Sequence, residues 1–243
     1  NDKKIKKIVL AYSGGLDTTV ILHWLKNKYD ADVITFTADI GQEQNEDLVR
    51  ERANSIGASK VIIEDLRERF TKDFIFPMFK ANAVYEGEYL LGTSIARPLI
   101  SERLVEIAEA EGADAIAHGA TGKGNDQIRF EIGSYSLNPD IKVLAPWRTW
   151  EYSSREELID YCKVHQIDID ASPEEPLYST DENLLHTSYE GEILEDPSVK
   201  APDNIWKRTA ALEDTPDTED IINLEFEKGE PIGINDIDYS PSE

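Results

Sequence analysis

The chain of 243 residues is 40% hydrophobic and 30% charged, and it carries a formal net charge of −24. These proportions are typical of a folded soluble protein with one large domain, or with one domain and a substantial extension. Because so acidic a surface repels phosphate backbones and anionic lipids, nucleic acid and membranes are not expected partners. The acidity is concentrated in residues 151–243, with 26 acidic and six basic side chains, and fits solubility or a high-salt habitat better than a binding role.

The cysteine content and the hydropathy pattern indicate a compartment. The single cysteine, Cys162, excludes an internal disulfide framework and favours a reducing environment. No apolar run reaches membrane-spanning length, and the Lys-rich start lacks the apolar core of a signal peptide. We therefore expect a cytoplasmic protein in which Cys162 is a small core residue rather than a reactive thiol.

Strands and helices alternate along the first two thirds of the chain. Short β-branched runs predict strands, and apolar residues at helical spacing predict helices. The fold class that follows is α/β, a doubly wound parallel sheet that binds ligands at the carboxyl ends of its strands. The predicted strands are 8–12, 32–39, 60–64, 114–118 and 141–144; the predicted helices begin at Leu16, cover 43–56, begin again near Leu66, cover 96–110, and extend from a cap at Ser153 or Ser154 towards His165.

The character of the chain changes after about Ile167. Several prolines interrupt it, and short strands are predicted at 221–226 and 232–237, separated by Gly229-Glu230-Pro231. We therefore predict one domain over 1–167 and a second, α+β lobe over 168–243. The final residues 240–243 resemble a helix start with no helix after it, so we expect the chain to be truncated.

The first candidate site is the stretch Tyr12 to Thr18, between the first predicted strand and the first predicted helix. Two glycines there allow a tight turn, and the N–H groups at the start of the helix form a cradle suited to phosphate. No lysine follows the glycines, so the stretch is not the nucleoside-triphosphate loop that ends in Gly-Lys-Ser/Thr. It resembles the SGGxD[ST] loop of the N-type ATP pyrophosphatases, and the alternative is an ordinary turn with two glycines.

A second glycine-rich stretch, residues 118–127, follows the predicted strand 114–118. It should lie on the same rim of the sheet as the first loop. Its glycines permit close approach of the backbone to a ligand, and Lys123 adds a mobile cation for phosphate. Asn125, Asp126 and Arg129 can recognise amino and carboxylate groups. A surface loop with incidental polar residues is the alternative, but two such loops on neighbouring strand ends favour a site.

Four segments together resemble the argininosuccinate synthase family. They are AYSGGLDTT (11–19), EGEYLLGTSIARP (86–98), HGATGKGNDQIRFE (118–131) and STDENLLHTSYEGEILEDP (179–197), in family order. The resemblance implies an ATP-dependent C–N ligase of arginine biosynthesis, which couples citrulline to aspartate and releases AMP and pyrophosphate. It also implies an adenine nucleotide alpha hydrolase-like domain over 1–167, part of a synthetase domain over 168–243, and a homotetramer for full-length members.

The resemblance assigns site residues position by position. It implies catalytic roles for Asp17 and Lys123, Mg²⁺ with the ATP phosphates, and citrulline contacts at Tyr89, Ser94, Asn125, Arg129, Ser179 and Ser188. Aspartate contacts are implied at Thr121, Asn125 and Asp126. The ATP-binding residues so implied are Ala11, Tyr12, Ser13, Gly14, Gly15, Leu16, Asp17, Thr18, Thr19, Ala38, Ala117, His118, Gly119, Ala120, Thr121, Gly122, Lys123, Gly124 and Asn125.

Structural alternatives stand beside several of these roles. Asp17 in the first helical turn can cap the helix instead of approaching Mg²⁺, and His118 can serve structure instead of touching phosphate. Tyr89 is otherwise a core tyrosine, and Ser94 is otherwise a helix N-cap. Arg97 next to Pro98 gives too weak a signal to be assigned a role.

Two other functions remain open from the sequence. A different ATP pyrophosphatase is disfavoured, because tRNA thiolation with paired cysteines does not fit a single cysteine and no N-terminal-Cys glutaminase is present. A non-catalytic adenine-nucleotide-binding module is the other alternative. Full-length family members continue well past Glu243 into further citrulline contacts and an oligomerisation arm. A chain that ends at Glu243 is therefore expected to bind ATP but to turn over poorly, and the tetramer is implied for full-length members only.

Overall fold

The computed structural model describes residues 4–122, 124–169 and 178–243. The chain divides into two compact units, one made of residues 1–39, 43–65 and 94–173, the other of 40–42, 66–93 and 174–243. Among the described residues, the helices are too short or too polar to cross a membrane. The domain boundary expected between residues 167 and 168 stays a prediction.

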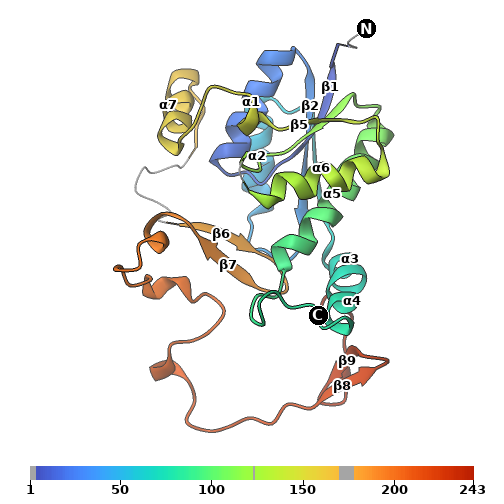
Figure 1. The fold of residues 1–243 in the computed structure, drawn as a ribbon, viewed down its shortest axis with the longest axis vertical. Coiled ribbons are helices and arrows are strands. Elements are labelled where there is room, and N and C mark those ends of the chain that lie inside the picture. Colours follow the sequence, from blue (N-terminus) through green and yellow to red (C-terminus); the bar gives the residue numbers. More distant parts are fainter. Residues whose placement is uncertain (1–3, 123, 170–177) are drawn as a thin grey trace. The chain divides into compact units, whose positions relative to one another are not determined.

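The first unit is built on a five-stranded parallel sheet with the order β3-β2-β1-β4-β5. Figure 1 labels β1, β2 and β5 of this sheet. Since the chain proceeds outward from β1 to β3 and then returns to place β4 on the other side of β1, the strand order reverses between β1 and β4. In doubly wound sheets, ligands bind at such a switch point. The strands are β1 (Lys7–Ala11), β2 (Asp32–Asp39), β3 (Lys60–Asp65), β4 (Ala115–Ala117) and β5 (Lys142–Leu144).

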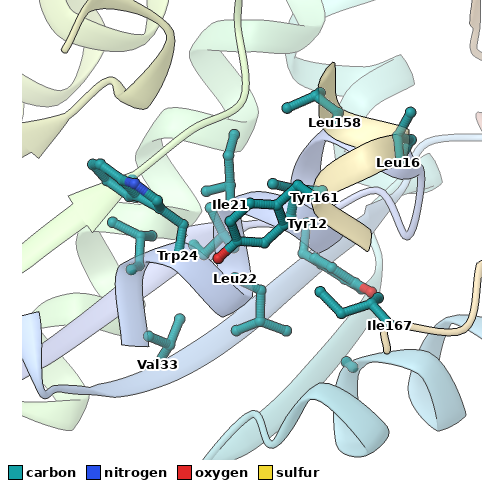
Figure 2. Packing of buried hydrophobic residues seen from close by; sticks show 14 of the residues in the cluster. Tyr12, Leu16, Ile21, Leu22, Trp24, Val33, Leu158, Tyr161 and Ile167 are labelled. Atoms are coloured by element: carbon teal, nitrogen blue, oxygen red, sulfur yellow. The ribbon is translucent and has the colours of Figure 1, made fainter. Parts of the chain in front are cut away.

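Helices cover both faces of this sheet, as the predicted α/β class requires. On one face of β1, Ile8 and Leu10 are buried against α1, α2 and α7. Because side chains alternate between the two faces of a strand, Val9 points to the opposite face, where it is also buried. Figure 2 shows Leu158 and Tyr161 of α7 packed with residues of α1 in this core. The helical segments of the unit are α1 (Leu16–Tyr29), α2 (Glu46–Ile56), α5 (Gly92–Glu111, its first two residues belonging to the other unit), α6 (Asn125–Leu137), the 3₁₀ turn η2 (Pro146–Arg148) and α7 (Arg155–His165).

The predicted elements of this unit exist, and two helix starts differ from prediction. Helix α2 begins at Glu46 instead of residue 43, because Asn45 caps it by accepting a hydrogen bond from the Leu48 N–H. Helix α5 begins at Gly92 instead of residue 96. The predicted cap of α7 is confirmed as a capping box between Ser154 and Glu157.

The second unit contains short elements. A helical run from α3 (Arg67–Phe70) through the π-helical η1 (Thr71–Ile75) to α4 (Phe76–Lys80) matches the helix expected from about Leu66. Pro77 has no N–H to donate, and the ladder widens just before it, with the Phe76 N–H donating to the Thr71 carbonyl. The other elements are the hairpin β6 (Ser179–Glu182) and β7 (Thr187–Glu190), the 3₁₀ turns η3 (Glu192–Glu195), η4 (Asp203–Ile205) and η5 (Leu212–Asp214), and the antiparallel strands β8 (Leu224–Glu227), β9 (Glu230–Ile234) and β10 (Ile237–Asp238).

The turn between β8 and β9 corrects one prediction. Glu230 and Pro231 were expected in the loop, but both belong to β9. Lys228 and Gly229 alone make the turn, with φ of 51° and 82°. Positive φ at both central residues matches the twist of a two-residue hairpin, which is why the loop is shorter than the Gly-Glu-Pro sequence suggests.

Candidate functional site

The turn after β1 leads directly into α1. Gly14 adopts φ of 77°, and a Cβ built there would lie 3.0 Å from Val49 Cγ2, so both conformation and space require glycine. Gly15 is the extended N-cap residue, and no side chain among the described residues caps the helix there. The N–H groups of the first turn therefore remain available to a bound anion, at the positive end of the helix dipole.

Hydroxyls and two long side chains hold this turn in shape. The Ser13 and Thr18 hydroxyls lie 3.1 Å apart, and the Gly15 N–H donates to Ser13 Oγ over 3.3 Å. Gln44 donates to the Ser13 carbonyl over 2.8 Å, and Arg52 donates to the Gly14 carbonyl. Because these two carbonyls already accept hydrogen bonds from Gln44 and Arg52, the N–H groups are the backbone groups left for a ligand. Sequence reasoning missed Gln44 and Arg52, since no local pattern links them to residues 13 and 14.

Three residues of the predicted ATP-binding set point into the core. Tyr12 is 3% exposed, and its hydroxyl lies 3.2 Å from that of Thr19, which is fully buried. Leu16 packs in the same cluster (Figure 2). A part in nucleotide binding for these three residues is therefore restricted to their backbone atoms.

Asp17 occupies the second position of α1. Since Gly15 is the N-cap residue, the capping role considered for Asp17 does not apply to its side chain. Burial raises the pKa of the Asp17 carboxyl, while the nearby charge of Arg155 on α7 lowers it. A half-buried carboxylate beside the phosphate cradle is suited to a cation or to orienting the loop.

The second glycine-rich loop leaves β4, the strand hydrogen-bonded beside β1, with Leu10 opposite Ala117. A Cβ built at Gly119 would lie 3.0 Å from Thr18 Cγ2 and 3.4 Å from Ile21 Cδ1. The two loops are therefore in contact at the switch point of the sheet. Gln127 donates to the Gly122 carbonyl over 2.8 Å, which ties the loop to α6. Lys123, the cation predicted for this loop, lies outside the described residues.

His118 is a buried support of this loop. It is 1% exposed, its ring stacks on Phe130 at 4.9 Å, and its Nδ1 accepts the Ala120 N–H over 3.2 Å. Burial lowers the pKa of His118 to about 4, with Arg148 acting in the same direction and Asp126 opposing it. The ring is therefore neutral near pH 7, and in the described residues its Nε2 has no hydrogen-bond partner. This placement matches the structural alternative for His118 better than direct contact with phosphate.

Asp126 lies between two arginines. Its carboxylate accepts hydrogen bonds from Arg97 Nε over 2.8 Å and from Arg129 Nη1 over 2.6 Å, and all three side chains are partly buried. The group carries a net positive charge, so it attracts a carboxylate-bearing ligand. Arg97 was left without a role from the sequence, and its partner 29 residues away explains why no local signal marked it.

The remaining predicted residues of the first unit lie around the same strand ends. Ala38 is at the carboxyl end of β2 and Ala117 at that of β4. Gly124 is the N-cap of α6, and Asn125 is its first residue. Thr121 and Asn125 are exposed, and Ala11, Ala120 and Gly122 are half-buried.

The predicted citrulline contacts are divided between the two units. Ser94, Asn125 and Arg129 belong to the first unit, and Tyr89, Ser179 and Ser188 to the second. Ser94 is the third residue of α5, so it is not the helix N-cap that its structural alternative required. Because Pro98 has no N–H, the Ser94 carbonyl lacks the usual helical donor four residues on. In the second unit, the Ser188 and Thr93 hydroxyls lie 3.5 Å apart, and the Tyr89 ring meets His186 edge-on at 5.2 Å.

Comparison with known proteins gives a consistent result along the chain. A family model described as "Arginosuccinate synthase N-terminal HUP domain" matches residues 7–168, and one described as "Arginosuccinate synthase C-terminal domain" matches residues 178–243. The curated relative from Dinoroseobacter shibae, named argininosuccinate synthase, is 62% identical over 98% of this chain and 59% of its own length. Relatives of the same name from Roseobacter denitrificans (61% identical over 98% of this chain) and a Psychrobacter species (57% over 100%) are matched over 59% and 60% of their lengths. The chain thus spans about 59% of these relatives.

Proposed function

Because the chain belongs to the argininosuccinate synthase family, we propose that it acts in the ATP-dependent joining of L-citrulline and L-aspartate to argininosuccinate, a step of arginine biosynthesis. AMP and pyrophosphate are the other products. One observation carries most of the proposal. Two glycine-rich loops leave the adjacent parallel strands β1 and β4 and touch at Thr18 and Gly119, beside the open N-terminus of α1.

The first loop and the start of α1 hold the β- and γ-phosphates of ATP. Backbone N–H groups in the first turn of α1 donate to phosphate oxygens, and the helix dipole favours the negative charge of phosphate. We assign to Lys123, which lies outside the described residues, a positive charge for the same phosphates. The same donors stabilise pyrophosphate as it leaves, so positioning and charge stabilisation carry the rate, and no nucleophilic side chain is required.

The residues fit Mg²⁺ that is bound mainly through phosphate. Mg²⁺ in nucleotide sites usually takes one or two protein carboxylates together with substrate oxygens. Asp17 is the carboxylate beside the cradle, and no group of three or more metal-ligating side chains occurs in the part of the chain that the structure describes. When bound, the ion neutralises charge on the departing pyrophosphate.

In the first chemical step, the ureido oxygen of citrulline attacks the α-phosphorus of ATP and pyrophosphate leaves, which gives a citrulline–AMP adduct. Tyr89, Ser94, Asn125, Arg129, Ser179 and Ser188 hold citrulline through hydroxyl, amide and guanidinium groups. Their match to the family pattern supports this assignment. Contacts within the second unit also support it, because Tyr89 packs against His186, and the Thr93 and Ser188 hydroxyls lie 3.5 Å apart.

In the second step, the amine of aspartate attacks the ureido carbon and AMP leaves with the ureido oxygen. Thr121, Asn125 and Asp126 orient the aspartate. Asp126 also fixes two guanidinium groups, and their excess positive charge attracts the carboxylates of aspartate. Arg97 therefore joins the proposed aspartate site as a residue that the family pattern alone did not supply.

Two further parts of the proposal concern the setting. We place the reaction in the cytoplasm, since the single thiol, Cys162, is buried and reduced thiols are typical of that compartment. The homotetramer is proposed for full-length family members only, on the resemblance of the four segments to that family.

An isotope experiment tests the proposal. The chain is incubated with ATP, Mg²⁺, aspartate and citrulline that carries ¹⁸O in its ureido group. The expected result is citrulline-dependent release of pyrophosphate, with one ¹⁸O in each AMP, because the ureido oxygen ends on the phosphate. ATP binding without citrulline-dependent release would instead identify a non-catalytic nucleotide-binding module. Release that requires another acceptor would identify a different ATP pyrophosphatase.

A further inference from the structure

The turn between β6 and β7, residues 183–186, is unusually well fixed by polar contacts. Asn183 is 2% exposed, and its Oδ1 accepts the backbone N–H groups of Leu185 over 3.0 Å and His186 over 3.3 Å. The Asn183 N–H donates to the His186 carbonyl over 3.1 Å. A buried amide with these bonds determines the conformation of the turn.

Arg208 holds the same turn from a distant part of the chain. Its guanidinium donates to the carbonyls of Asn183 and Leu184, and its Nε donates to Thr187 Oγ1 over 3.0 Å. The Leu184 N–H donates to the Ile40 carbonyl over 2.8 Å. The bonds from Asn183, Arg208 and Leu184 fix the turn through groups other than the His186 Nε2. That nitrogen makes a contact outside the turn.

That contact is with the segment that carries Tyr89. The Gly92 N–H, at the start of α5, donates to His186 Nε2 over 2.8 Å, and the Tyr89 ring packs edge-on against the imidazole at 5.2 Å. The fit is close, because a Cβ at Gly92 would lie 2.6 Å from His186 Nε2 and 2.8 Å from Asn183 Oδ1. The glycine at residue 92 is thus required by the approach of the turn.

The same imidazole connects two segments that each carry a predicted citrulline contact. Tyr89 lies on one side of it, and Ser188 follows two residues later on β7, where its hydroxyl lies 3.5 Å from that of Thr93. The contacts of His186 join the β6–β7 hairpin to residues 89–93 within the second unit.

We propose that His186 is a positioning residue for citrulline, which holds residues 89–93 in place beside Ser188 by accepting the Gly92 N–H. This inference rests on the proposed function, and it adds a residue that touches no substrate. The role requires a neutral imidazole whose proton is on Nδ1, because only an unprotonated Nε2 accepts a hydrogen bond.

The charges around His186 favour that neutral form. Burial lowers the pKa of His186, and the positive charge of Arg208 lowers it further, while Asp181 and a hydrogen bond to the Thr187 backbone raise it. The contact is therefore intact above the ordinary histidine pKa of about 6.5 and is lost as the pH falls through the lowered value.

Two substitutions separate positioning from general stability. His186→Ala removes the acceptor. His186→Gln places a carbonyl oxygen as many bonds from the backbone as Nε2, and this oxygen does not titrate. His165→Gln serves as the matched control, since His165 is an exposed histidine in the first unit.

The measured quantities are the KM values for citrulline and ATP in citrulline-dependent pyrophosphate release, from pH 5 to 8. His186→Ala should raise the citrulline KM at least tenfold while the ATP KM stays within twofold. His186→Gln should stay within about threefold of the unsubstituted chain and should lack its rise in citrulline KM at acid pH. An unchanged citrulline KM in His186→Ala, an equal rise in both KM values, or an acid rise that persists in His186→Gln would overturn the proposal.

Hydrogen exchange at the Gly92 amide tests the contact without any turnover. Exchange should be at least tenfold faster in His186→Ala than in the unsubstituted chain and should stay slow in His186→Gln. Equal exchange in all three would overturn the inference. If the unsubstituted chain shows no citrulline-dependent pyrophosphate release, the proposed function is refuted. If release is normal and His186→Ala leaves the citrulline KM unchanged, only the role of His186 is refuted.

Discussion

The contact between the two glycine-rich loops can be tested by adding one methyl group. Gly119 follows β4, and a Cβ at this position would lie 3.0 Å from Thr18 Cγ2 and 3.4 Å from Ile21 Cδ1. Gly119 does not have the positive φ that favours glycine, so Gly119→Ala introduces crowding without backbone strain. The substitution therefore probes the proximity of the loops and little else.

The expected cost follows from the packing. Carbon atoms in contact lie about 3.5–4.0 Å apart, and Ile21 is fully buried in α1, so the loop after β4 has to move away. Overpacking of this kind costs about 1–3 kcal/mol. In a chain of this size, that corresponds to a fall in melting temperature of roughly 2–12 °C. Displacement of the loop should also weaken ATP binding about tenfold or more, since the donors of both loops must face one ligand.

A compensating substitution makes the reasoning refutable. Thr18→Ser removes the crowded methyl but keeps the hydroxyl that lies 3.1 Å from Ser13 Oγ. Alone, it should cost about 1 kcal/mol for the lost buried methyl. Urea unfolding of the two single variants and the double variant should give a coupling free energy of at least about 1 kcal/mol, with the double variant more stable than the sum predicts. Additivity within about 0.5 kcal/mol would mean that the loops do not touch.

Three further predictions concern single side chains. Asp126→Asn should raise the aspartate KM about tenfold or more and affect the burst of pyrophosphate formed without aspartate less, because Arg97 and Arg129 lose their common partner; equal loss in both assays would count against the aspartate assignment. Burial keeps His118 neutral in the folded state, with a pKa of about 4. The free energy of unfolding measured in urea should therefore fall by about 3 kcal/mol between pH 7 and pH 4, and His118→Leu should not show this fall. Identical pH dependence of the two proteins would contradict this. Burial raises the pKa of Cys162 to about 11, so a thiol reagent should label the native chain roughly 100-fold more slowly than the urea-unfolded chain, and similar rates would disprove its core position.

Local signals were sufficient for the sheet and for the first loop. The run Ile8–Tyr12, the glycines after it and the apolar periodicity from Leu16 predict a strand, a turn and a helix, and the structure has all three. These features depend on backbone conformation and on burial of neighbouring residues, which the sequence displays directly. The start of α5 was predicted four residues late, because Gly92 and Pro98 are poor helix formers that tertiary contacts retain in the helix.

Long-range pairing was less accessible to sequence reasoning. Arg97 meets Asp126 across 29 residues, and Gly92 meets His186 across 94. The division into compact units also joins residues 66–93 to the C-terminal part of the chain, although the sequence suggested a single change of character near residue 167. Each of these features depends on which segments pack together, and no periodicity or turn signal records that choice.

The central claim is that the loops after β1 and β4 hold the same triphosphate. The most direct measurement follows the backbone amide resonances of Gly14, Gly15 and Gly119 by NMR during titration with ATP, pyrophosphate or AMP. Amides of both loops should shift together with ATP, with one dissociation constant, and pyrophosphate should reproduce much of this change while AMP should not. Movement of one loop only, or different dissociation constants for the two loops, would contradict it.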